Sequence, residues 1–182
     1  MVEMTIYGVS FDLVGKQPIV LLKTADGNRY LPIWVGHSEA AAILMKLQGA
    51  TAPRPLTHDL LVNILGALDV EVVRVTVTEL RENTFHASIT VTQNGAEVEI
   101  DSRSSDAIAV AVRAQVPIFA ADDVIEESAI EMEGDEINED EVVDEFRRFL
   151  DHVSAEDFIE AEVEGDLPGA EEDVEAEAED DD

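Results

Sequence analysis

The side chains best suited to chemistry in this sequence are a small set of acids, one histidine and two arginines. They are Glu39, His58, Asp59, Asp101 and Asp106, with Arg54 and Arg103 beside them. Carboxylates can hold a divalent metal ion, histidine titrates near neutral pH, and the guanidinium group pairs with phosphate. Phosphodiester cleavage needs an activated oxygen nucleophile, stabilisation of charge on the phosphoryl group and a proton for the leaving oxygen. The set contains groups for each of these tasks.

The acids have a structural alternative. Glu39 and Asp106 lie at predicted helix starts, where the helix dipole alone stabilises a negative charge. Asp59 follows Thr57, a predicted helix cap, and the same reasoning applies to it. No recognised metal-ligand spacing such as His-x-x-x-His is present. The metal requirement therefore stays open, and magnesium is the cofactor to expect if these carboxylates bind a metal ion.

The two arginines each precede a predicted helix N-terminus. An anion such as phosphate binds readily at that position, which makes Arg54 and Arg103 candidate substrate-binding residues. The alternative is a surface ion pair with a neighbouring acid, which would contribute little to binding or stability.

The elements that carry these residues occur twice in the chain. The predicted strands are residues 4–13, 19–22 and 30–35 in the first half and 70–80, 85–91 and 98–101 in the second. Asp26-Gly27 and Asn94-Gly95 are hairpin signals at nearly the same position in each half. Ser38-Glu39 and Ser105-Asp106 each open a predicted helix, with the two serines as N-caps, and they are offset by 67 residues. This self-similarity predicts a duplicated unit of three antiparallel strands and a helix.

A further helix is predicted between the halves. Pro53 and Pro55 keep the preceding segment extended, and Thr57 is predicted to cap a helix. Its apolar side chains have the spacing of an amphipathic helix and are Leu60, Leu61, Ile64, Leu65 and Leu68. Residues 117–120 are predicted to form a last short strand or extended edge. Strands in runs with helices between them favour a two-layer α+β fold.

Acidic residues are concentrated at the C-terminal end. Residues 1–125 hold 9 Lys and Arg against 15 Asp and Glu, whereas residues 126–182 hold 2 against 27, in a chain of net charge −31. We therefore predict a domain at residues 1–130, an acidic linker at 131–159 with a short amphipathic helix over 139–153, and a disordered acidic tail at 160–182. A solubilising tail is favoured over a nucleic-acid mimic that occupies the domain's phosphate site, because acidic blocks are usually solvated.

Several protein classes are disfavoured by composition. The chain has no cysteine, which excludes disulfides, thiolate metal sites and cysteine nucleophiles. It shows no secretory signal and no apolar run near the roughly 20 residues that cross a bilayer. The expectation is a cytoplasmic protein that makes no membrane contact.

Four segments in order resemble the bifunctional nuclease (BFN) domain family. They are residues 29–40, 54–60, 105–109 and 117–119, with Arg29-Tyr30-Leu31-Pro32-Ile33-Trp34 in the first and Arg54-Pro55-Leu56-Thr57-His58-Asp59 in the second. The resemblance implies nuclease activity on both DNA and RNA. Glu39, His58, Asp59 and Asp106 are then the candidate catalytic residues. One departure is Arg103-Ser104-Ser105-Asp106-Ala107, where the family usually has proline second, and it predicts a looser turn before the helix.

Three hypotheses of different class follow. The leading one is a nuclease of low sequence specificity that binds DNA and RNA weakly, because a mildly acidic domain lacks the basic face typical of nucleic-acid binding. The alternative is a non-catalytic regulatory module that binds an anion or a partner protein at its helix starts. The third is a structural homo-oligomer with an interface around Trp34, a residue otherwise predicted to lie in the core.

Overall fold

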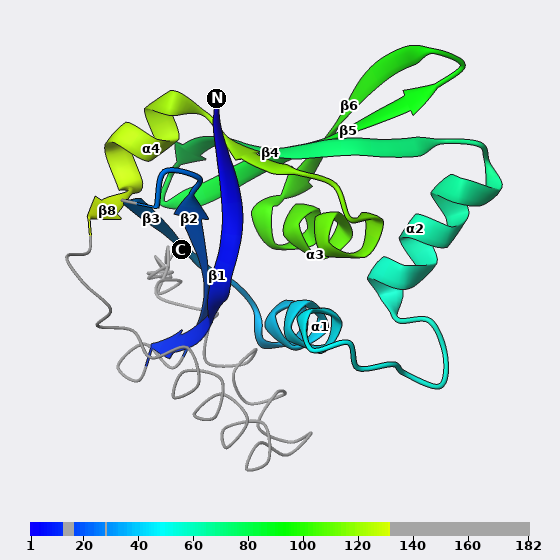
Figure 1. Ribbon diagram of the computed structural model, residues 1–182, viewed down its shortest axis with the longest axis horizontal. Helices are drawn as coiled ribbons and strands as arrows, with labels where there is room; N and C mark the ends of the chain where they lie inside the picture. The colour runs from blue at the N-terminus through cyan, green and yellow to red at the C-terminus, as the bar shows by residue number, and fades with distance from the viewer. Residues whose placement is uncertain (13–16, 28, 132–182) are drawn as a thin grey trace, which may run out of the picture. The chain divides into compact units, whose positions relative to one another are not determined.

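The computed structural model describes residues 1–12, 17–27 and 29–131 (Figure 1). In this part of the chain the strands are β1 Val2–Asp12, β2 Gln17–Thr24, β3 Arg29–Trp34, β4 Glu71–Arg81, β5 Thr84–Gln93, β6 Ala96–Arg103, β7 Ile118–Ala120 and β8 Ile130–Glu131. The helices are α1 His37–Leu47, α2 Thr57–Ala67, α3 Ser104–Ala114 and α4 Asp122–Ser128. The predicted helix at 139–153 and the predicted tail at 160–182 lie outside the described residues.

All strands of the described part form one sheet in the order β6-β5-β4-β7-β1-β2-β3-β8. Neighbouring strands are antiparallel except β4 and β7, which are parallel. The prediction of a short strand at residues 117–120 is confirmed by β7, whereas the alternative of an extended edge was wrong, because β7 lies in the middle of the sheet and joins the two halves. The central position of β7 could not be predicted from its three residues, because long-range contacts decide which strands pair.

The predicted duplication is confirmed. The order β1-β2-β3-α1 recurs as β4-β5-β6-α3, and α1 and α3 begin 67 residues apart at His37 and Ser104. The hairpin between β5 and β6 turns at Asn94 and Gly95, whose φ values of 52° and 79° are the left-handed conformations that this dipeptide favours. The fold is therefore α+β, as the pattern of the sequence indicates.

The predicted helix caps were wrong by one or two residues. The N-cap residues are Gly36 for α1, Leu56 for α2 and Arg103 for α3, and none of them makes a side-chain capping hydrogen bond. Ser38 and Ser105 are instead the second residues of their helices. The predicted loose turn before α3 is also absent, because β6 ends at Arg103 and α3 begins at Ser104.

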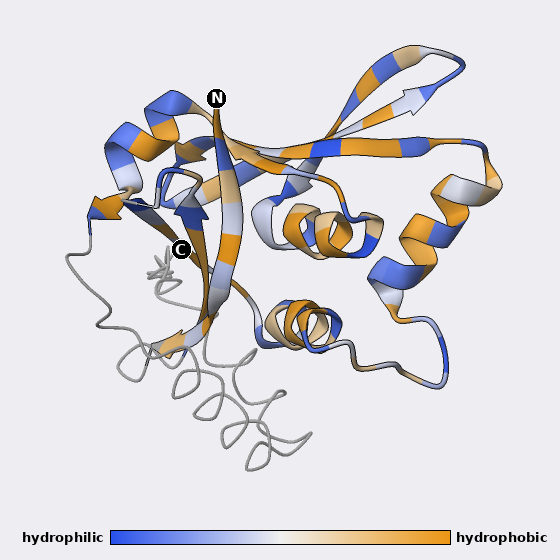
Figure 2. Ribbon diagram, viewed as in Figure 1, coloured by the Kyte–Doolittle hydropathy of each residue, from blue (hydrophilic) through white to orange (hydrophobic). Residues whose placement is uncertain are grey.

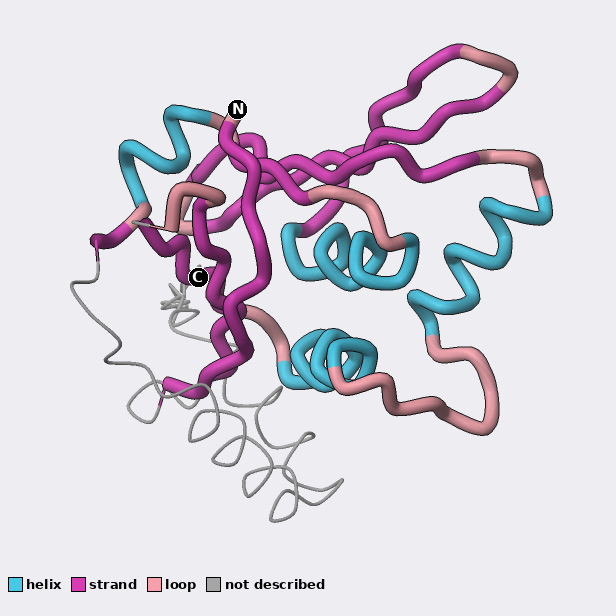
Figure 3. The backbone as a smooth tube through the Cα atoms, in the orientation of Figure 1, coloured by secondary structure: helices cyan, strands magenta, loops and turns pink. Residues whose placement is uncertain are grey.

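The core lies between the sheet and the helices α1 and α3. These two helices pack against each other, α3 packs on β4, β5 and β6, and α1 packs on β2 (Figure 3). The fully buried side chains include Leu22, Leu31, Ile33, Ile43 and Ile108. Burial of these aliphatic groups is the main force that holds the two helices on the sheet.

Trp34 and helix α2 both expose apolar side chains. Trp34 at the end of β3 is 51% exposed, so it is not a core residue. Helix α2 forms as predicted and packs on α3 and β4, but none of its residues is buried. Figure 2 shows the hydrophobic colouring of this helix.

Among the helices of the described residues, none has the length and apolar character that a membrane span needs.

Candidate functional site

Three helix N-termini carry the candidate acids. Glu39, Asp59 and Asp106 are each the third residue of their helix, in α1, α2 and α3 respectively. An acid in the first turn is stabilised by the unpaired backbone N–H groups and by the helix dipole. Helix formation alone therefore explains why an acid stands at each position, and the contacts between the helices decide which of them form a site.

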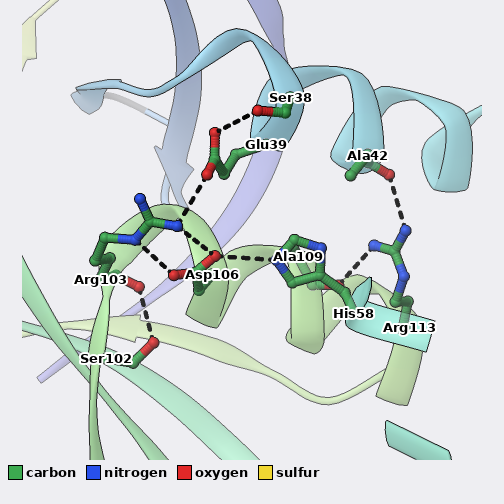
Figure 4. Close-up of polar contacts among 9 residues, drawn as sticks. All are labelled: Ser38, Glu39, Ala42, His58, Ser102, Arg103, Asp106, Ala109 and Arg113. Carbon is green, nitrogen blue, oxygen red and sulfur yellow. Dashed lines mark hydrogen bonds and ion pairs between the residues drawn. The ribbon is translucent and has the colours of Figure 1, made fainter. Parts of the chain in front are cut away.

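Arg103 connects the N-termini of α1 and α3. Its Nε donates to Asp106 Oδ2 at 2.7 Å, and its Nη2 donates to Asp106 Oδ1 at 3.1 Å and to Glu39 Oε1 at 2.9 Å (Figure 4). Glu39 and Asp106 are also equivalent positions in the duplicated unit, 67 residues apart. The acids of both halves thus meet on one guanidinium group, which is 67% exposed.

His58 joins this group from α2. Its Nε2 lies 3.0 Å from Asp106 Oδ1, and its side chain is only 12% exposed. Because an ionised carboxylate only accepts hydrogen bonds, Nε2 carries the proton, and Nδ1 is the basic nitrogen of the neutral ring. Glu39, Arg103, Asp106 and His58 therefore form one connected cluster, which we call the Arg103 cluster.

The ionisation of the Arg103 cluster follows from its hydrogen bonds. Burial raises the pKa of Asp106, but the hydrogen bonds from Arg103 and His58 outweigh burial and hold this pKa below its ordinary value. The hydrogen bond to Asp106 in turn raises the pKa of Arg103. Asp106 is therefore a carboxylate at neutral pH and can stabilise a positively charged His58.

Asp59 has a different set of partners. Its Oδ2 accepts a hydrogen bond from the Leu56 backbone N–H at 2.9 Å, and its Oδ1 accepts one from Arg113 Nε at 2.6 Å. Burial raises the pKa of Asp59, but the bonds from Leu56 and Arg113 outweigh it and lower this pKa below the ordinary value. Both oxygens of Asp59 thus serve to fix α2, and no contact in the described residues links Asp59 to the Arg103 cluster.

Arg113 is a residue that the sequence analysis missed. Besides Asp59, it donates through Nη1 to the Ala109 carbonyl at 2.9 Å and through Nη2 to the Ala42 carbonyl at 3.2 Å, and its side chain is 4% exposed. It therefore ties α1, α2 and α3 together. Figure 4 shows its contacts with Ala42 and Ala109. The position of Arg113 at the end of the apolar run of α3 could have indicated a buried ion pair, because a buried arginine is usually paired.

Arg54 lies outside the Arg103 cluster, beside a cavity of about 300 Å³. The cavity is lined by the end of α1, the segment before α2 and the start of α2, and its charged lining residues are Lys46, Arg54, Asp59 and Arg113. Arg54 makes no ion pair within the described part of the chain. Because Asp59 and Arg113 neutralise each other, Lys46 and Arg54 give this cavity a positive charge. None of the residues of the Arg103 cluster lines this cavity.

The arrangement does not form a ready metal site. Among the described residues, no group of three His, Asp or Glu side chains is placed to hold a metal ion. The Glu39 and Asp106 carboxylates are suitable donors for magnesium, but both already accept hydrogen bonds from Arg103. A metal ion bound between them would have to displace that guanidinium group.

Comparison with known proteins places the chain in a family. The bifunctional nuclease domain matches residues 20–133. Two uncharacterized proteins of Mycobacterium tuberculosis, from strains CDC 1551 and H37Rv, are 40% identical over 163 residues, which is 86% of this chain and 97% of each of them.

Rice proteins with a nuclease name are more distant. Bifunctional nuclease 2 of Oryza sativa subsp. japonica is 28% identical over 106 residues, or 56% of this chain and 33% of its own length. The bifunctional nuclease of Oryza minuta is 29% identical over 103 residues, or 54% of this chain and 31% of its own length. The match to the domain covers more than half of the chain, and the mycobacterial proteins match it over nearly their full length. The chain therefore belongs to the bifunctional nuclease domain family.

Proposed function

We propose that this protein is a nuclease that hydrolyses phosphodiester bonds of DNA and RNA, with the Arg103 cluster as its active site. The observation that carries the proposal is the joining of Glu39 and Asp106 through one exposed arginine, with His58 hydrogen-bonded to Asp106. Membership in the bifunctional nuclease domain family and the names of the rice relatives support the reaction class. The cluster supplies the groups that this reaction class requires.

Arg103 is the group that binds the scissile phosphate. Its Nε and Nη2 are engaged by the two carboxylates, whereas its Nη1 makes no hydrogen bond in the described part of the chain. A phosphate oxygen can accept from Nη1 while Glu39 and Asp106 hold the guanidinium group in place. The charge that develops on the phosphoryl oxygens during attack is stabilised by the same contact.

His58 is the general base. Its Nδ1 removes a proton from a water molecule, the water oxygen forms a bond to phosphorus, and the bond from phosphorus to the leaving sugar oxygen breaks. The imidazolium ion then returns a proton to the leaving oxygen or to solvent. Asp106 holds the ring through Nε2 and stabilises its positive charge, and Glu39 positions Arg103.

Substrate binding in this proposal is weak and shows little sequence preference. The described cations that we propose for phosphate binding are Arg103 and, in the cavity at the start of α2, Lys46 and Arg54. Few phosphate contacts give low affinity that falls further as salt rises. Contacts to phosphate carry no base information, so DNA and RNA are both acceptable substrates.

The metal requirement is a separate part of the proposal. Magnesium remains the expected ion if one takes part, but the steps above are assigned to protein side chains because the described donors do not form a metal site. Cleavage that persists in the presence of a chelator is the result expected from this arrangement.

The test is cleavage of labelled single- and double-stranded DNA and RNA by the purified protein, with and without EDTA. Wild type is compared with Glu39→Ala and His58→Ala. Glu97→Ala is the matched control, because Glu97 lies on β6 opposite Thr92 and its described ion pair is with Arg74. We expect cleavage by wild type and Glu97→Ala, and a loss of roughly 100-fold or more in His58→Ala.

The alternative function is a non-catalytic module that binds an anion or a partner protein. The observation in its favour is that both acids of the Arg103 cluster are already paired, which is also typical of a structural ion-pair network. If no preparation cleaves any of the four substrates while wild type still binds them and Glu39→Ala does not, the alternative is correct and the catalytic assignment is wrong.

A further inference from the structure

Helix α2 exposes a row of large apolar side chains. Leu60 is 52% exposed, Leu61 39%, Ile64 47% and Leu68 61%. The three residues Leu60, Ile64 and Leu68 are four apart, so they lie along one side of the helix. We call the four residues the α2 face.

The α2 face has no covering element within the described residues. Helix α2 packs on α3 and β4, and it carries no buried residue although most of its length is apolar (Figures 1 and 2). A helix of 11 residues is too short to be stable in water by itself, and most of its stability must come from packing of its apolar side. Contiguous exposed apolar side chains of this kind mark interaction surfaces.

We propose that the α2 face is covered by the same face of a second copy of this chain, with the two α2 helices antiparallel about a twofold axis at Ile64. The face is self-complementary in this arrangement. Leu60 of one copy lies against Leu68 of the other, and Ile64 lies against Ile64. A twofold interface requires such a match of one surface patch with itself.

The charges at the two ends of α2 favour the antiparallel arrangement. Lys46 and Arg54 lie beside the N-terminal end of the helix, and Asp69 and Glu71 follow its C-terminal end. In the part of the chain that the structure describes, neither Arg54 nor Asp69 takes part in an ion pair. An antiparallel pair brings the basic end of one copy toward the acidic end of the other, whereas a parallel pair would bring like charges together.

The absence of cysteine allows a direct test on the full chain. A cysteine introduced by Ile64→Cys is the only thiol of the protein, and Ile64 is exposed, so the substitution leaves the core of the protomer unchanged. The variant is treated with a short bismaleimide, which joins two thiols that lie close together. Ile100→Cys is the matched control, because Ile100 is 42% exposed on β6 and lies outside the α2 face.

Orientation is tested with Leu60→Cys and Leu68→Cys. In an antiparallel pair, a mixture of these two variants is cross-linked between unlike chains, and neither variant alone is cross-linked efficiently. Light scattering of the wild type and of Ile64→Glu gives the mass without a cross-linker. Circular dichroism of each variant shows that the fold is retained.

The proposal predicts a wild-type mass twice the 19.9 kDa of the chain and a single-chain mass for Ile64→Glu. It predicts strong cross-linking of Ile64→Cys, at least 10-fold above Ile100→Cys. A wild type that keeps the single-chain mass at every concentration overturns it. Cross-linking of Ile100→Cys in place of Ile64→Cys also overturns it and places the contact on β6. These readouts do not depend on nuclease activity.

Discussion

At the scale of single residues, the position of Glu39 depends on the glycine that precedes its helix. A Cβ atom at Gly36 would lie 2.3 Å from Glu39 Oε2 and 3.3 Å from its Cδ. Gly36 has φ −69° and ψ 157°, a conformation that alanine adopts without strain. A side chain at this position therefore acts on the Glu39 carboxylate and leaves the backbone unchanged.

Gly36→Ala is expected to displace the Glu39 carboxylate from Arg103 and to lower the cleavage rate by about 10-fold, because the arginine loses one of its two anchors. Gly8→Ala is the control, since a Cβ at Gly8 meets no atom within 4 Å. The measurements are the cleavage rate and the melting temperature. An unchanged rate in Gly36→Ala would show that Glu39 does not position Arg103.

Asp106 makes stability depend on pH in a defined direction. Its pKa is lowered in the folded protein, so its contribution is fully present above its ordinary pKa of about 4 and is lost as the pH falls through the lowered value. Asp106→Asn should therefore be less stable than wild type at neutral pH, and the difference should shrink below about pH 4. Thermal melts from pH 2 to 7 measure it, and a difference that stays constant over this range contradicts the assignment.

The candidate residues could be predicted from the sequence only as residue types at helix starts. The 67-residue repeat identified Glu39 and Asp106 as equivalent positions, and the structure brings both onto Arg103. The sequence did not show that Asp59 pairs with Arg113, because choosing the partner of an acid needs the packing of α2 on α3. For the same reason the role of Gly36 could not be predicted.

At the scale of elements, Arg113 is the contact that fixes the start of α2. A buried charge is costly without its partner, and Arg113 bridges Asp59 and two backbone carbonyls. Strands β1 to β7 and helices α1 to α3 were predictable from apolar periodicity and turn residues, whereas α4 and β8 were not predicted. The central position of β7 and the exposed side of α2 were not predictable, because periodicity shows that a face is apolar but does not show what covers it.

Arg113→Met is expected to destabilise the protein by about 3 kcal/mol, the lower end of the cost of breaking a buried ion pair, because Asp59 is partly exposed. Arg74→Met is the matched control. Arg74 pairs with Glu97 at 3.2 Å on an exposed part of the sheet, and its loss should cost less than about 1 kcal/mol. Urea unfolding measures both, and equal costs would mean that Arg113 does not fix α2.

At the scale of the whole molecule, the charge of the chain opposes its proposed substrate. The net charge of −31 is concentrated toward the C-terminal end, and the described cations proposed to bind phosphate are Arg103, Lys46 and Arg54. Binding of nucleic acid should therefore be sensitive to the acidic C-terminal residues.

Removal of residues 160–182 takes away 13 acids and no base and changes the formal net charge from −31 to −18. We expect tighter binding of nucleic acid at low salt and a gain that shrinks as salt rises, since the Debye length is about 10 Å at 0.1 M. Binding titrations at several salt concentrations measure this, with the melting temperature as a control for the fold. An affinity that is unchanged at every salt concentration would show that these acids do not influence the bound ligand.

A double-mutant cycle of cleavage rates with Arg103→Ala and His58→Ala tests whether the Arg103 cluster is the active site. Both residues are held by Asp106 and act in the same step, so each single variant should lose roughly 100-fold or more, and the double variant should be little worse than the slower single one. That result means that the Arg103 cluster works as one catalytic unit. Cleavage at the wild-type rate in Arg103→Ala, or losses that simply multiply in the double variant, would contradict the assignment of the Arg103 cluster as the active site.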